Sequence, residues 1–86
     1  MTPDNRREIF SHRDEAAVIK GISQDDGSER TITDKSLGEA IVFVSEQAAT
    51  DAATAYIVYG QSTCLSYTDC LSVYRDYGAV LRQAQR

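Results

Sequence analysis

The chain has 86 residues with a formal net charge of −4, a single histidine and no tryptophan. This length fits one small domain, 1–86, and leaves no room for separate catalytic and regulatory units. No apolar run approaches the roughly 20 residues of a membrane span, and the charged N-terminus lacks the apolar region of a signal peptide. We therefore expect a cytoplasmic protein without a membrane segment.

The negative charge is concentrated in the middle of the chain. Residues 22–50 contain six acidic residues against two basic ones, which accounts for the whole excess because the flanking segments are balanced. Without clustered lysine and arginine, no direct nucleic-acid binding is expected. An acidic surface would instead suit a protein partner with a basic surface, although a solvated face that keeps the protein soluble explains the same charges.

The N-terminal part of the chain admits two interpretations. Thr2 as N-cap and Pro3 at the first helical position predict a long N-terminal helix. In the alternative, residues 16–23 form a strand that turns and returns through residues 30–33 as a β-hairpin. We favour the helix, which leaves 22–35 as a loop or hairpin connection.

The next segment carries a clear helix-start signal. Ser36 and Glu39 have the spacing of a capping box, and apolar residues then recur at helical spacing as far as Gly60. A break near residue 50, followed by a short strand at 56–59, is the alternative because that tetrapeptide is rich in β-forming residues.

The last segment reads as a helix that Ser66 or Thr68 caps. Its apolar stripe consists of Tyr67, Cys70, Leu71, Tyr74, Gly78 and Leu81, with Tyr77 on the edge. We therefore predict a mostly α-helical fold, a small bundle of about three helices with a helical hairpin at 36–85. The alternative is an α+β fold with an N-terminal β-hairpin, a helix, a strand at 56–59 and a C-terminal helix.

Few residues could support catalysis or hold a metal ion. Glu8 and Glu15 stand at helical ligand spacing from His12, but the sequence offers no second histidine, and a charged surface stripe explains the three residues better. Neither Cys64 nor Cys70 has a recognisable base partner, and we expect free thiols. No calcium-loop or phosphate-binding glycine pattern occurs. We expect no cofactor, no metal site and no enzyme activity.

The tyrosines are the main candidates for a binding surface. All five lie between positions 56 and 77, in a stretch with little charge, and tyrosine is enriched where proteins meet. With no tryptophan and only two phenylalanines, the chain must also use tyrosine to fill its core. We assign Tyr67 and Tyr74 to the core, and Tyr59 and Tyr77, followed by Tyr56, to an interface.

These features predict a non-enzymatic protein-binding regulator or inhibitor that acts through its tyrosine-rich back half and its acidic middle. The predicted partner-binding residues are Tyr59, Tyr77, Tyr56, Asp25, Asp26 and Glu29. Phage-encoded inhibitors of nucleic-acid-binding host complexes offer a class analogy for this role. A homo-oligomeric structural or accessory subunit, with the tyrosines buried in a homodimer, is the second hypothesis, and a small Cys/His metal protein or enzyme is the third.

Overall fold

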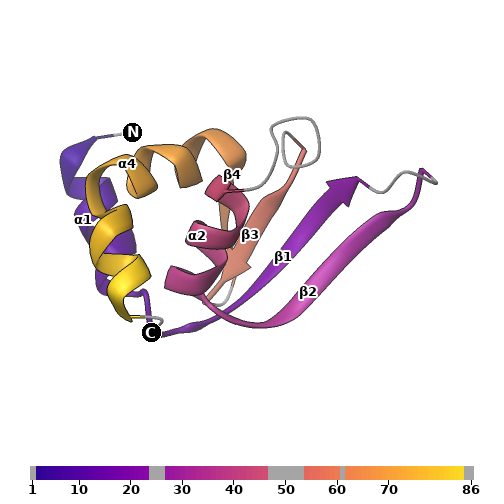
Figure 1. The fold of residues 1–86 in the computed structure, drawn as a ribbon, viewed down its shortest axis with the longest axis horizontal. Coiled ribbons are helices and arrows are strands. Elements are labelled where there is room, and N and C mark those ends of the chain that lie inside the picture. The colour runs from indigo at the N-terminus through magenta and orange to yellow at the C-terminus, as the bar shows by residue number, and fades with distance from the viewer. Residues whose placement is uncertain (1, 24–26, 47–53, 61, 85–86) are drawn as a thin grey trace.

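The chain has an α+β fold in a computed structural model that describes residues 2–23, 27–46, 54–60 and 62–84 (Figure 1). The helices are α1 (Pro3–Ser11), α2 (Leu37–Glu46) and α4 (Tyr67–Ala84), and the strands are β1 (Ala16–Ser23), β2 (Glu29–Ser36), β3 (Tyr56–Tyr59) and β4 (Thr63–Ser66). The prediction of a mostly helical bundle with a helical hairpin at 36–85 is therefore wrong. The α+β alternative, with its N-terminal hairpin and its strand at 56–59, is confirmed.

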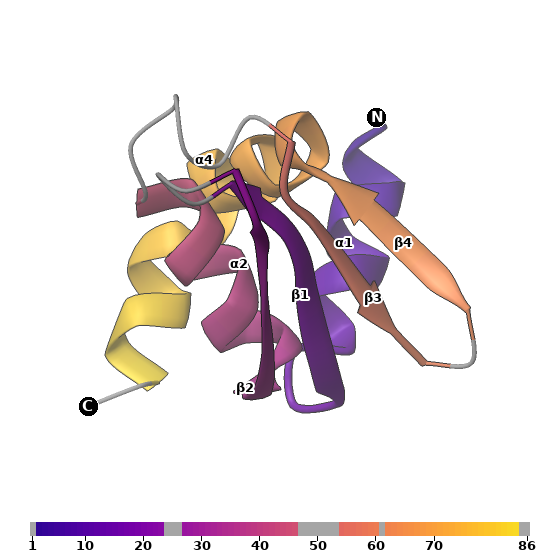
Figure 2. The same ribbon diagram turned by 90° about the vertical axis from the view of Figure 1, so that its right-hand side faces the viewer.

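The four strands form one antiparallel sheet in the order β2-β1-β3-β4. One row of register partners crosses all four strands, from Ile32 through Ile19 and Ile57 to Leu65. All four side chains are buried. The described helices lie on this side of the sheet, behind the strands in Figure 2, and the core lies between the two layers.

The N-terminal helix is shorter than predicted because the following segment is a central strand. Thr2 caps α1 as expected, since the backbone N–H of Asn5 donates to its Oγ1 at 3.2 Å, but the helix ends at Ser11. From there β1 pairs with β2 on one side and β3 on the other, and alternate residues such as Ala17 and Ile19 are buried. Pairing on both edges outweighs the weak helical spacing of this segment.

Two of the strands pass directly into helices through reciprocal caps. Glu39 N donates to Ser36 Oγ at 3.3 Å while Ser36 N donates to the Glu39 carboxylate at 3.2 Å, which confirms the predicted capping box at the β2–α2 junction. At the β4–α4 junction, Asp69 N donates to Ser66 Oγ at 3.2 Å and Ser66 N donates to the Asp69 carboxylate at 3.4 Å. Ser66 is therefore the N-cap of α4.

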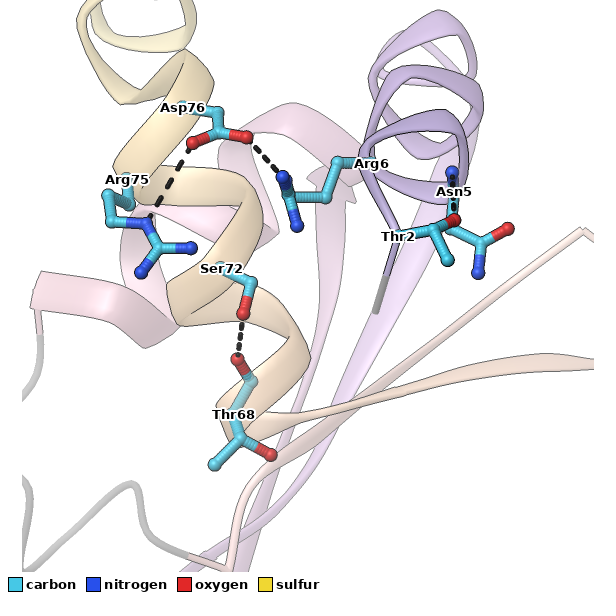
Figure 3. Close-up of polar contacts among 7 residues, drawn as sticks. All are labelled: Thr2, Asn5, Arg6, Thr68, Ser72, Arg75 and Asp76. Atoms are coloured by element: carbon cyan, nitrogen blue, oxygen red, sulfur yellow. Dashed lines mark hydrogen bonds and ion pairs between the residues drawn. The ribbon is translucent and has the colours of Figure 1, made fainter.

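The helices α1 and α4 pack against each other through one aromatic and one ionic contact. The rings of Phe10 and Tyr77 are stacked with centroids 4.4 Å apart. Arg6 of α1 forms an ion pair with Asp76 of α4, as Figure 3 shows. None of the described helices is long and apolar enough to span a bilayer.

Candidate functional site: an open sheet face and an acidic groove

No described helix covers the second face of the sheet (Figure 2). Side chains reach this face from every second strand position. They form two rows of register partners, which we call the open face: Val18, Val58 and Cys64, and beside them Lys20, Tyr56 and Ser66. Val18 and Val58 lie on the two central strands and are half-buried, whereas Cys64 is exposed. The middle of this face is therefore apolar.

Tyr56 is held on the open face by a glycine. Gly21 has φ +78° and lies where the register between β1 and β2 shifts. A Cβ at this position would lie 3.3 Å from the Tyr56 ring and 2.5 Å from the backbone oxygen of Thr54. Glycine therefore allows both the left-handed backbone and the close approach of the ring. Tyr56 remains 39% exposed, so the ring forms part of the surface.

A groove of about 410 Å³ lies between α1 and the β3–β4 hairpin. Several of its lining residues are ionisable or reactive, namely Glu8, His12, Glu15, Tyr59, Cys64 and Asp69. Three of them are acids, and no described residue that lines the groove is a lysine or an arginine. We call it the acidic groove.

The three acids of the groove come from three different segments of the chain. Glu8 belongs to α1, Glu15 to the turn before β1, and Asp69 to the first turn of α4. The Asp69 carboxylate also accepts the hydrogen bond from Ser66 N that caps α4, which fixes its position. The acidity of the groove is therefore a product of tertiary packing.

Glu15 is positioned by its backbone and by its neighbours. Its backbone oxygen accepts a hydrogen bond of 2.8 Å from Leu37 N at the start of α2. Its side chain contacts His12 and lies beside the β3–β4 turn, where a Cβ on Gly60 would be 3.9 Å from one carboxylate oxygen. The carboxylate thus faces the groove.

Tyr59 belongs to the core and also lines the groove. Its side chain is only 8% exposed, and its ring centroid lies 6.2 Å from that of His12. Its hydroxyl makes no hydrogen bond within the described part of the chain, where no fully buried side-chain oxygen lacks a partner, so the hydroxyl opens into the groove. Burial, followed by the charges of Glu8 and Glu15, raises the pKa of Tyr59. The phenol is therefore neutral at physiological pH.

The structure places the predicted interface tyrosines in three different environments. Tyr56 lies on the open face and Tyr59 lines the acidic groove. Tyr77 is half-buried between α1 and α4 against Phe10. The predicted tyrosine surface is therefore not one continuous patch.

The described acids from the middle of the chain lie in separate places. Glu29 is exposed at the start of β2, and Asp25 and Asp26 lie outside the described residues. Glu39 caps α2, and Glu46 accepts hydrogen bonds from the C-terminal helix. Within the described segments, the acids that converge are those of the groove.

Sequence reasoning identified part of the groove and missed the open face. Glu8, His12 and Glu15 do line the same groove, although the helix that was predicted to place them on one face ends before His12. Val18 and Val58 were missed. The signal that could have found them is the unbroken apolar run at 16–19 and at 56–59, because successive strand residues point to opposite faces and such a run places apolar side chains on both.

The two cysteines are free thiols in unlike settings. Cys64 is exposed on β4, and Cys70 is buried on α4, where burial raises the pKa of its thiol to about 12. Among the residues that the structure describes, no group of three histidine, cysteine, aspartate or glutamate side chains could hold a metal ion. Comparison of the chain with protein-family models, curated proteins and solved structures finds no match.

Proposed function

We propose that the protein is a non-enzymatic regulator or inhibitor that binds a larger protein through its open face. The observation that carries this proposal is the apolar row of Val18 and Val58 on a sheet face that no described helix covers. A sheet face in water ordinarily carries polar side chains, whereas an apolar centre beside a tyrosine is typical of the core of a protein interface. Tyr56 supplies that aromatic residue.

The acidic groove supports a partner with a basic surface. Cys64 belongs to both the open face and the groove, so one partner can contact both. Opposite charges across an interface accelerate association and select the partner. Occlusion of a nucleic-acid-binding host complex, by analogy with phage-encoded inhibitors, is part of this proposal. So is a cytoplasmic location, where free thiols such as these are kept reduced.

The test is capture of host proteins on the immobilised chain, with Val58→Lys compared with the wild type. Val80→Lys is the matched control, because Val80 is 51% exposed on α4 and adds the same charge away from the open face. Burial of an unpaired ammonium at an apolar contact should weaken capture by about tenfold or more. The control should capture the same proteins as the wild type, and circular dichroism should show both variants folded.

Undiminished capture by a folded Val58→Lys variant would refute the proposal. Light scattering on the wild type and on Val58→Lys tests whether the open face binds a second copy of the chain instead of another protein. A wild-type dimer that this substitution dissociates would assign the open face to a second copy of the chain. The homodimeric-subunit hypothesis would then replace the proposal.

A further inference from the structure

We propose that the acidic groove binds the cationic end of a lysine or arginine side chain from a basic segment of the partner protein. The inference rests on the proposed function in taking the ligand to be a protein segment, and it concerns the acidic groove, which shares Cys64 with the rows of the open face. Three observations carry it: the negative charges of the groove, the unpaired hydroxyl of Tyr59 and the volume of the groove.

No lysine or arginine compensates the charge of the groove within the described part of the chain, although the His12 ring contacts the Glu15 carboxylate. Glu8, Glu15 and Asp69 line it without any lysine or arginine among them. Two arginines, one in α1 and one just after it, make contacts outside the groove. Arg6 forms an ion pair with Asp76. Arg13 donates a hydrogen bond to the Phe10 carbonyl and lies over the Phe10 ring. A cation that enters the groove therefore meets carboxylates that no arginine or lysine of the groove neutralises.

Tyr59 points to a ligand independently of these charges. Its side chain is more than nine-tenths buried, yet its hydroxyl has no hydrogen-bond partner in the described chain and opens into the groove. Because every fully buried side-chain oxygen in the described part of the chain is paired, this hydroxyl is accessible from the groove, where an atom of a bound ligand can replace water as its hydrogen-bond partner. An aromatic ring beside carboxylates is also a favourable setting for an ammonium or guanidinium group.

The size of the groove fits a side chain with its adjoining backbone. A cavity needs only about 10–15 Å³ of accessible space to hold a single ordered water, far less than the groove of about 410 Å³. Its position also fits, because it continues from the open face at Cys64. A partner seated on that face can therefore extend a basic segment past β4 toward α1.

The test measures binding of a fluorescent peptide of alternating lysine and glycine by anisotropy. A peptide with arginine in place of lysine and one with acetylated lysines are run beside it. Glu8→Gln and Glu15→Gln remove one groove charge each, and Glu29→Gln removes the same charge from an exposed site on β2. Tyr59→Phe removes only the hydroxyl.

We expect the lysine or the arginine peptide to bind and the acetylated peptide not to bind. Each groove glutamine variant should raise the Kd about tenfold, since hydrogen bonds to charged groups are lost. Glu29→Gln should change the Kd by less than about twofold, because an exposed charge outside the groove is screened. Tyr59→Phe, checked for folding by circular dichroism, should raise the Kd about threefold or more.

Equal weakening by Glu29→Gln and the groove variants would overturn the inference, because it would reduce binding to net charge. Binding of free spermidine without binding of either basic peptide would also overturn it. The Val58→Lys variant keeps the two proposals distinguishable, since it should lose the partner and still bind the peptide. If capture depends on Val58 while peptide binding ignores Glu8 and Glu15, the groove inference fails and the proposed function stands.

Discussion

Replacement of Gly21 by alanine tests how Tyr56 is held on the open face. Gly21 has φ +78°, and a left-handed backbone costs a residue with a Cβ about 1–2 kcal/mol. The added Cβ would also lie 2.5 Å from the Thr54 backbone oxygen and 3.3 Å from the Tyr56 ring. The first contact is too short for any real Cβ, so the start of β3 must move away from β1.

A second glycine separates these two costs. Gly27 has φ +84°, but a Cβ there would meet nothing within 4 Å, so Gly27→Ala should cost the backbone strain alone. Gly21→Ala adds overpacking of about 1–3 kcal/mol, which brings its total to about 2–5 kcal/mol. The entropy that alanine removes from the unfolded chain is common to both variants and cancels in the comparison.

The measurement is urea unfolding followed by circular dichroism, with linear extrapolation of the free energy of unfolding. We expect Gly21→Ala to lose at least about 1 kcal/mol more than Gly27→Ala, which corresponds to a difference of about 4–8 °C in Tm. A chain of this size has about 4–13 kcal/mol of stability, so a loss of about 5 kcal/mol removes at least about two-fifths of it. Equal losses in the two variants would refute the close approach of β1 and β3 at Gly21.

Two further predictions concern the titratable groups. In the native protein a thiol reagent should modify Cys64 alone. Cys70 is buried, and burial raises the pKa of its thiol to about 12. Two rapidly reacting thiols would show that α4 is not packed as described. Hydrogen bonds from Tyr74 and then Arg82 lower the pKa of Glu46 below its ordinary 4.5, so their stabilisation is present above that pH and is lost as the pH falls below it. Tyr74→Phe should therefore lower the Tm more at about pH 7 than at about pH 3, and equal losses would contradict this linkage.

The parts of the fold that the sequence predicts correctly are those with local causes. The caps at Thr2, Ser36 and Ser66 depend on a side chain and a backbone N–H a few residues away, and each forms as expected. The fold class depends instead on β1, whose side chains can be read at either helical or strand spacing. Pairing with β2 and β3 makes this segment a strand, and that pairing joins residues that are far apart in the sequence.

The candidate site likewise combines residues that are close in sequence with residues that only the fold brings together. Glu8, His12 and Glu15 are close in sequence, and the short turn after α1 keeps them together even though the helix has ended. Asp69 reaches the groove only because the start of α4 follows β4. Tyr59 lines the groove because it lies two residues after the inward-facing Ile57, a position that became known once β3 had a register.

The caps at the strand–helix junctions have a consequence for the sheet itself. Ser36 is at once the register partner of Ala16 in the hairpin and the cap of α2. A slip of β2 by one residue along β1 would therefore break the cap of the helix as well as the pairing of Ser36 with Ala16. The edge strand is thus held in alignment from outside the sheet, despite the two register shifts that it contains with β1. Loss of either layer removes support from the other, which favours a single cooperative unfolding transition.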